Sequence, residues 1–286
     1  MFNFFANLFG YVLNAIYEIV NNYGLAIIIF TILLKVIMLP ISIKQQKTMK
    51  KTSKIQAEVK ELQKKYSNDQ MKLNQETLDL YKRENMSPFS GCLSSIVQFI
   101  IVLSMFFLVS KPLTFMKHID TDTLNNYAKE IQEETGSQLR YQEIAIIKEK
   151  SSQDENVNLN MNFLGLDLSD VPTQDYSDWK VFVIPVLYVI TSIISMKLTT
   201  NLNKSTKKDN AEEVIDNNKD DKEKSKEKDD DAMLEMSKQM TLMMPIMSVS
   251  IALIAPLGLA LYWFVNNLLM IGERLLINKF FKSEEE

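Results

Sequence analysis

The sequence predicts an all-α, multi-pass membrane protein with five transmembrane helices, an N-terminal amphipathic interfacial helix and a cytoplasmic helical hairpin. Of the 286 residues, 46% are hydrophobic and 24% are charged, and the two kinds occupy separate blocks of the chain. A soluble domain would mix them at a period of two or about 3.6 residues. The apolar blocks are long enough to cross a bilayer as helices, and basic residues collect at alternate ends of them.

The composition excludes several classes of function. The net charge is -4, which gives no reason to expect direct recognition of nucleic acid. A single cysteine, Cys92, excludes an internal disulfide framework, and a single histidine, His118, argues against a histidine-based metal site or a catalytic triad. HExxH, GxSxG and P-loop motifs do not occur in the sequence. We therefore expect no enzymatic activity, no metal and no cofactor.

Residues 1–23 are expected to form an amphipathic helix that lies in the membrane interface. Asparagines and Glu18 fall mostly on one side of this helix, and apolar residues fall on the other. An ordinary helix packed on the bundle is the alternative. The apolar positions are Phe2, Phe5, Phe9, Val12, Leu13, Ile16, Tyr17 and Val20.

The first transmembrane helix is predicted at residues 24–43, with its end near Pro40 to Ile43. Its charged residue is Lys35, and Thr31 lies one turn earlier on the same face. A lysine at this depth costs about 2.5–3.5 kcal/mol on insertion scales, so Lys35 marks a candidate functional site. Either a hydrated cavity surrounds it or its stem reaches the inner headgroups, because none of the five spans is expected to supply an acidic partner.

Residues 44–90 begin with a run of lysines, which places this segment in the cytoplasm and the N-terminus outside. Apolar residues recur at helical spacing from Ile55 to Tyr66, and a similar stripe follows the turn-like residues 67–69. This pattern predicts an antiparallel helical hairpin. Two functions stay open for it: a mobile platform for a client or the ribosome, and a solvated link between two spans.

The second transmembrane helix is predicted at residues 91–110 and carries Ser94 and Gln98 one turn apart. A glutamine in lipid needs polar partners, so these two residues either line a cavity or hold helices together. Residues 111–178 are polar and acidic, which suits an extracytoplasmic segment. Within that segment we expect a helix near 123–134 and a short strand or entry segment at 160–168.

The third transmembrane helix is predicted at residues 179–197. Trp179 is its expected interface anchor, and Pro185 is a possible site of a kink. Residues 198–238 form a charged loop of low complexity that cannot bury a core, so we expect it to be disordered in the cytoplasm.

The fourth and fifth transmembrane helices are predicted at residues 239–256 and 258–278, joined by a tight turn, with a cytoplasmic tail at 279–286. The N-terminus is then expected outside the cell and the C-terminus in the cytoplasm. Methionines recur every three or four residues before and within the fourth span, either as a packing face or as a flexible surface for apolar segments. They are Met233, Met236, Met240, Met243, Met244 and Met247.

Together these segments resemble a known family. The stretch YGLAIIIFTILLKVIMLPISIKQQKTMKK, the hairpin with IQAEVKELQKKYSND and LDLYKRENMSPFSGCLSSIVQFII, and the closing MMPIMSVSIALIAPLGLALYWFVNNLL closely resemble the YidC-type membrane protein insertases. That family is also called YidC/Oxa/Alb, and the chain is most similar to its Gram-positive-type members, which have no large extracytoplasmic domain. The resemblance covers the chain except residues 118–158 and 200–232.

The resemblance implies a hydrophilic groove that is open to the cytoplasm and to lipid and closed on the outside. The groove cation falls on Lys35, where the family commonly has arginine. The tail of this chain, KSEEE, is short and acidic, so the basic ribosome-binding tail of some family members is not expected here. Thr31 and Gln98 match groove-lining positions, and Tyr262 and Trp263 match an aromatic pair that contacts clients. The expected groove residues are Lys35, Thr31, Gln98, Ser94, Tyr262 and Trp263.

The resemblance further implies a membrane protein insertase and chaperone of the cell membrane, acting without enzymatic chemistry. The expected partners are nascent or newly made membrane proteins, membrane lipid, the Sec translocon and the translating ribosome. Two alternatives stay open. One is a channel or carrier for a small anion with Lys35 as its selectivity charge, and the other is a purely structural partner of the translocon.

Overall fold

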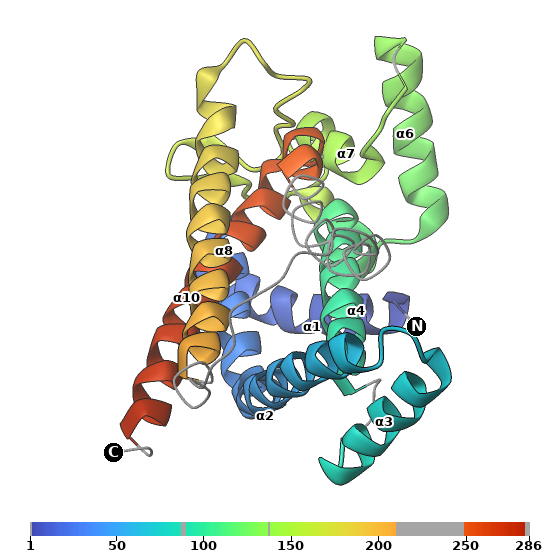
Figure 1. Ribbon diagram of the computed structural model, residues 1–286. Coiled ribbons are helices and arrows are strands. Elements are labelled where there is room, and N and C mark those ends of the chain that lie inside the picture. The colour runs from blue at the N-terminus through green and yellow to red at the C-terminus, as the bar shows by residue number, and fades with distance from the viewer. Residues whose placement is uncertain (1, 87–89, 137, 210–248, 284–286) are drawn as a thin grey trace. The chain divides into compact units, whose positions relative to one another are not determined.

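The computed structural model describes residues 2–86, 90–136, 138–209 and 249–283, and these are mostly helical (Figure 1). The all-α prediction is therefore confirmed at the level of fold class, with one small sheet. The helices are α1 (Phe2–Val20), α2 (Tyr23–Lys65), α3 (Gln70–Arg83), α4 (Ser90–Ser110), α5 (Pro112–Phe115), α6 (Thr121–Thr135), α7 (Gln142–Lys150), α8 (Val183–Asp209) and α10 (Leu257–Ser283). The 3-10 turns are η1 (Glu155–Val157) and η2 (Trp179–Phe182), and residues 249–254 are also helical.

The chain divides into two compact units, and each is described by itself. Unit 1 contains Met1–Met38, Gln98–Ser195 and Met247–Glu286. Unit 2 contains Leu39–Val97 and Met196–Ile246. Two of the described helical segments are long and apolar enough to cross a membrane, Tyr23–Thr48 and Trp179–Leu198.

Helix α1 has two apolar faces. Ala6, Gly10, Leu13 and Tyr17 are buried against unit 1 at helical spacing. A second stripe on the opposite side of the helix leaves large apolar side chains exposed. A helix that packs on one side and presents apolar residues on the other suits the interfacial location that the sequence predicts. The exposed residues are Phe4, Leu8, Tyr11 and Ile19.

Helix α2 does not end at the expected position near residue 43. It continues through Pro40 to Lys65 without a break. A proline inside a helix removes one backbone hydrogen bond, but the lysines, glutamines and glutamates that follow are strong helix formers. The expected change from transmembrane helix to cytoplasmic hairpin therefore occurs within one continuous helix.

In unit 2, helix α3 follows α2 after a turn at residues 66–69. The Asp69 carboxylate accepts a hydrogen bond from the backbone N–H of Lys72 and caps α3. Arg83 at the end of α3 forms an ion pair with Glu58 of α2 at 3.1 Å. Both side chains of this pair are well exposed, so it contributes little to stability.

Helix α8 also differs from the prediction. It continues to Asp209, past the expected end of the third span at 197. Pro185 lies in its first turn, where a proline replaces an N–H that would have no partner within the helix, so no kink is needed there. The rest of the expected loop, the methionines at 233–247 and most of the expected fourth span lie outside the described residues.

The segment at 111–178 is well structured within unit 1. The helix expected near 123–134 is present as α6, which Asp120 caps by accepting the backbone N–H of Thr123. Strands β1 (Asn162–Phe163) and β2 (Leu166–Asp167) pair antiparallel, with Phe163 opposite Leu166. Leu164 and Gly165 form the turn, and both have positive φ, as a type I′ hairpin turn requires.

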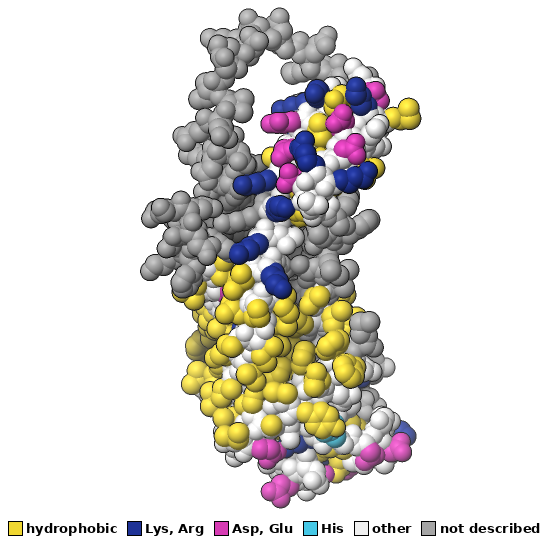
Figure 2. Space-filling model, turned by 90° about the horizontal axis from the view of Figure 1, so that it is seen from below, with side chains coloured by type: hydrophobic (Ala, Val, Ile, Leu, Met, Phe, Trp, Pro, Cys, Tyr) yellow, Lys and Arg dark blue, Asp and Glu magenta, His cyan; other side chains and the backbone are white. Residues whose placement is uncertain are grey.

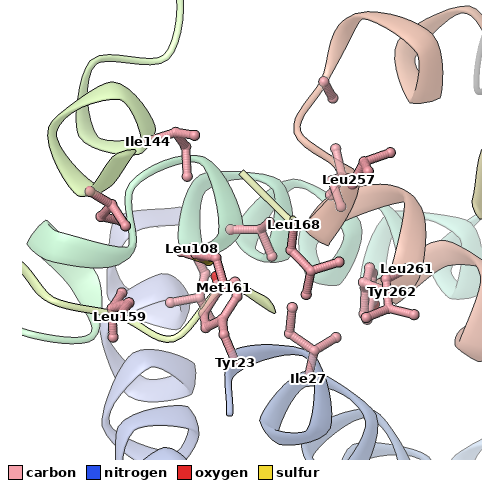
Figure 3. Close-up of a cluster of buried hydrophobic side chains, with 14 of the residues drawn as sticks. Tyr23, Ile27, Leu108, Ile144, Leu159, Met161, Leu168, Leu257, Leu261 and Tyr262 are labelled. Atoms are coloured by element: carbon pink, nitrogen blue, oxygen red, sulfur yellow. The ribbon is translucent and has the colours of Figure 1, made fainter. Parts of the chain in front are cut away.

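The hydrophobic core of unit 1 joins the beginnings of two long helices to this segment (Figure 3). Tyr23 and Ile27 of α2 lie beside Leu261 and Tyr262 of α10 in this cluster. Side chains from the surrounding elements complete it: Leu108, Ile144, Leu159, Met161, Leu168 and Leu257. The starts of α2 and α10 are therefore joined to the segment at 111–178 by tight apolar packing.

The outside of unit 1 is apolar over a wide area. Figure 2 shows hydrophobic side chains covering most of the described surface in the lower half of the view, with acidic side chains at its lowest edge. Helices α2 and α8 supply much of the exposed apolar surface of this unit. Such a large exposed area indicates a surface in contact with lipid or with another chain. These residues include Leu25, Ile29, Ile32, Leu33, Val36 and Ile37 of α2 and Val186, Leu187, Ile190, Ile193 and Ile194 of α8.

Candidate functional site

The starts of α2 and α10 lie close together in unit 1, because the segment at 160–168 forms hydrogen bonds with both. The backbone N–H of Tyr23 donates to the carbonyl of Asn160 at 2.9 Å. The backbone N–H of Gly258 donates to the carbonyl of Leu168 at 3.0 Å. A β-carbon on Gly258 would lie 3.5 Å from the ring of Tyr23, so the two helix starts are in direct contact.

An ion pair joins the two helices further along. The Lys35 Nζ of α2 lies 3.1 Å from the Glu273 Oε2 of α10. At about 1.5 Å per residue, Lys35 lies roughly 18 Å along its helix from Tyr23, and Glu273 lies roughly 22 Å along its helix from Gly258. The two side chains are 23% and 9% exposed. The pair therefore lies well away from the packed starts of both helices.

This ion pair corrects the prediction that the five spans hold no acidic partner for Lys35. Glu273 lies within the expected fifth span at 258–278, but Glu273-Arg274 reads in sequence as the charged border where a helix leaves the membrane. One signal was available: Tyr262, Asn266 and Glu273 share one face of α10 at helical spacing. That polar stripe predicts a face turned toward polar neighbours rather than toward lipid.

A second cation lies beside the pair. The Arg274 guanidinium of α10 donates to the backbone carbonyl of Ser195 in α8 at 3.3 Å, with the Ser195 hydroxyl at 3.5 Å. The sequence places Arg274 among the basic residues that are expected to keep the tail in the cytoplasm, and the structure packs it against Ser195, a buried residue of α8. We call Lys35, Glu273, Arg274 and Ser195 the polar layer. Its formal charges are two positive and one negative, so the layer is net positive.

Thr31 lies one turn before Lys35 on the same face of α2. Its side chain is 1% exposed, and its hydroxyl donates to the carbonyl of Ile27 at 2.6 Å. A threonine that bonds back to its own helix satisfies its hydroxyl without a partner from another helix. Along α2, Thr31 lies one turn after Ile27 of the apolar cluster and one turn before Lys35 of the polar layer.

The aromatic pair of α10 packs inside unit 1. Tyr262 belongs to the apolar cluster of Figure 3, and Trp263 is 8% exposed. The Trp263 ring lies against the ring of Tyr188 of α8, with their centroids 5.6 Å apart. This contact packs α8 against α10 at a position nearer the start of α10 than the polar layer is.

Two further groove candidates are placed only by their backbone. Ser94 and Gln98 belong to helix α4, but their side chains lie outside the described part of the structure. Within the described ranges, the acidic, histidine and cysteine side chains form no group that could hold a metal ion. The site that the structure does describe is thus an ionic and hydrogen-bonded layer between apolar helices.

The chain was compared with known protein families. The family model described as "60Kd inner membrane protein" matches residues 15–285, which is most of the chain. The chain belongs to the 60Kd inner membrane protein family. This result confirms the resemblance to YidC-type insertases that the sequence indicated.

Several curated relatives in this family carry the name "Membrane protein insertase YidC". The protein from Fusobacterium nucleatum is 39% identical over 106 residues, which cover 37% of this chain and 52% of that protein. The protein from Caldanaerobacter subterraneus is 44% identical over 97 residues, covering 34% of this chain and 47% of that protein. The protein from Geotalea daltonii is 28% identical over 264 residues, covering 92% of this chain and 35% of that protein. The matches therefore span about half of these relatives or less.

Proposed function

We propose that this chain is a membrane protein insertase and chaperone that binds the hydrophilic tails of client proteins and releases their apolar segments into the bilayer. Membership of the 60Kd inner membrane protein family supports the insertase role and a role without enzymatic chemistry. The observation that carries the mechanism is the net positive polar layer, which lies between helices with apolar outer surfaces.

The proposed topology has five spans in the cell membrane, with the N-terminus outside and the C-terminus in the cytoplasm. The exposed apolar residues of α2 and α8 support membrane crossing by these two helices. The lysines from residue 44 onward in α2 support a cytoplasmic location for its second half, by the positive-inside rule. The acidic segment 111–178 then lies outside, and α3 with the end of α2 forms the cytoplasmic hairpin.

The proposed groove opens to the cytoplasm at the polar layer. Its residues are Lys35, Thr31, Gln98, Ser94, Tyr262 and Trp263, with Arg274 and Glu273 added from the structure. An acidic tail gains Coulomb energy in this layer because the layer is partly buried, with Lys35 23% and Glu273 9% exposed, so its charges are screened less than at an open surface. The tail then needs to cross only the outer part of the membrane, and the apolar segment of the client moves into lipid along the outer surface of α2 and α8.

Cooperation with the Sec translocon and the translating ribosome belongs to this proposal, as do newly made membrane proteins as clients. A channel or carrier for a small anion receives less support, because the ammonium of Lys35 already has a carboxylate partner at 3.1 Å.

The test is insertion of a short client with an acidic N-terminal tail into proteoliposomes. Lys35→Arg is expected to keep insertion, whereas Lys35→Ala and Lys35→Glu are expected to lose most of it, because only arginine preserves the positive charge. The same vesicles, loaded with a halide-sensitive dye, test the channel alternative. Anion flux that depends on Lys35, without client insertion, would contradict the proposed function.

A further inference from the structure

The polar layer contains its own carboxylate. An insertase that captured acidic tails with a free lysine would need only the cation. Here the Lys35 ammonium instead forms an ion pair with Glu273, whose side chain is 9% exposed. The carboxylate of Glu273 thus occupies the position that a carboxylate of a client tail would take beside Lys35.

The geometry allows one carboxylate to replace another. A lysine ammonium has three N–H donors, and in the described part of the chain the structure shows one bonded, to Glu273 Oε2. The Lys35 side chain is also 23% exposed, so a second acceptor can reach it. An incoming carboxylate can therefore bind Lys35 before Glu273 leaves. The Lys35 ammonium is then paired throughout the exchange and is at no point an uncompensated charge, which would be costly.

We propose that Glu273 determines client specificity by competing with the client's acidic tail for Lys35. This inference rests on the proposed function and assigns a role to a residue that the groove model does not need. A neutral tail offers nothing to exchange for Glu273. A tail with one carboxylate replaces the Glu273 carboxylate at Lys35 by another carboxylate and gains little. A tail with several carboxylates holds them at a high local concentration near Lys35, so when one leaves another can bind. Glu273 therefore sets how acidic a tail must be to enter.

The alternative is that the ion pair only holds α2 and α10 together. Both roles predict that Lys35 matters, but they predict opposite effects for Glu273→Gln. Glutamine has the same shape and keeps an acceptor for the ammonium, so packing is preserved while the competing charge is removed. If Glu273 determines specificity, Glu273→Gln should free Lys35 for clients and raise insertion of acidic tails. If Glu273 is purely structural, Glu273→Gln should at best leave insertion unchanged.

The experiment measures insertion into proteoliposomes by protease protection of the tail. Three clients share one apolar segment and carry zero, one or three aspartates in the tail. The full chain is compared with Glu273→Gln, Lys35→Gln and the double variant Lys35→Gln/Glu273→Gln. Glu18→Gln is the matched control, because Glu18 forms an ion pair with Lys117 at 2.8 Å in the same unit, and the Glu18 side chain is 60% exposed. Thermal unfolding in detergent checks that each variant is folded.

We expect Glu273→Gln to raise insertion of the one-aspartate tail by roughly fivefold, the factor for an ion pair of modest strength. The three-aspartate tail should gain less, and the neutral tail should not change. Lys35→Gln should reduce insertion of both acidic tails, because it leaves the Glu273 carboxylate to repel them. The double variant should insert them better than Lys35→Gln does, and Glu18→Gln should match the unchanged chain.

Two results would overturn the inference while the proposed function stands. One is that the unchanged protein inserts clients and Glu273→Gln alters the insertion of none of the three tails. The other is a Glu273→Gln variant that loses insertion of all three tails equally and unfolds at a lower temperature, since that pattern marks a structural ion pair. If wild-type vesicles insert no more client than protein-free vesicles do, the proposed function itself fails and the inference fails with it.

Discussion

The ring of Phe163 packs directly on the backbone of Gly24, so that a β-carbon on Gly24 would lie 2.5 Å from the Phe163 Cγ. Phe163 belongs to the small β-hairpin, and Gly24 is the second residue of α2. Around this contact, the side-chain amide of Asn22 donates to the carbonyl of Asn162 at 2.7 Å, and that of Asn160 donates to the carbonyl of Asn21 at 2.9 Å. The hairpin therefore fixes the position at which α2 starts.

Gly24→Ala is expected to destabilise the protein by about 1–3 kcal/mol, because the added methyl group must displace the Phe163 ring. Thermal unfolding in detergent measures the loss. Gly272→Ala is the matched control, since a β-carbon there meets nothing within 4 Å and alanine is favoured over glycine in a helix by roughly 1 kcal/mol. Equal melting temperatures for the two variants would contradict the close packing at Gly24.

The hairpin turn offers a prediction of the opposite sign. Leu164 has a φ of 53°, a left-handed conformation that is costly for leucine and tolerated by asparagine. Its side chain is exposed, so little packing is lost when it is replaced. Leu164→Asn is expected to stabilise the protein by about 0.5–1 kcal/mol. Gly165→Ala, at a φ of 80°, should destabilise it in the same unfolding assay, and a stabilising effect there would contradict the turn geometry.

Trp263 provides a test of whether the aromatic pair supports the fold. Its ring is buried against Tyr188, so Trp263→Ala should lower the free energy of unfolding by about 3–5 kcal/mol. Trp263→Phe keeps an aromatic partner for Tyr188 and should cost clearly less. A Trp263→Ala variant that melts like the unchanged protein but no longer crosslinks to a client would instead indicate a direct contact with clients.

The segment at 111–178 should lose stability in acid. The Asp154 carboxylate accepts the backbone N–H of Asn156 at 2.9 Å and the hydroxyl of Tyr127 at 2.8 Å. These hydrogen bonds, with that of Asn156 first, hold the pKa of Asp154 below its ordinary value. A lowered pKa in the folded state means that the stabilisation is fully present above the ordinary pKa of about 3.9 and is lost as the pH falls from there through the lowered pKa of the folded protein.

The corresponding variant is Asp154→Asn. At pH 7 it should melt below the unchanged protein, because asparagine carries no charge for these two donors to stabilise. As the pH falls toward the acid range, the two melting curves should converge, since the wild-type carboxylate becomes protonated as well. A difference in melting temperature that stays constant from neutral to acid pH would show that the charge of Asp154 contributes nothing.

The sequence predicted what depends on local pattern. Long apolar runs predicted α2 and the apolar part of α8, and the charge in such a run identified Lys35. A polar stretch with an apolar stripe predicted α6. Features that depend on the meeting of distant segments were missed. Glu273 and Arg274 looked like the charged end of a helix, and only the packing of α10 on α2 and α8 shows that both make polar contacts there.

The lengths of the helices were missed for a different reason. Charged residues after an apolar run mark where a helix leaves lipid, but they do not end the helix, because lysine and glutamate continue it readily. For that reason α2 extends to Lys65 and α8 to Asp209. The residue at which a helix leaves lipid and the residue at which the helix ends are different positions. The pattern of charged residues predicts only the first of them.

The continuity of α2 has a consequence for its backbone amides. A loop at residue 44 would leave the amides there without helical partners, and they would exchange readily with solvent deuterium. An unbroken helix from Tyr23 to Lys65 instead gives the amides after its first turn a carbonyl four residues earlier, except at Pro40, which has no N–H. Slow exchange on both sides of Pro40 is therefore the expected signature of one continuous helix.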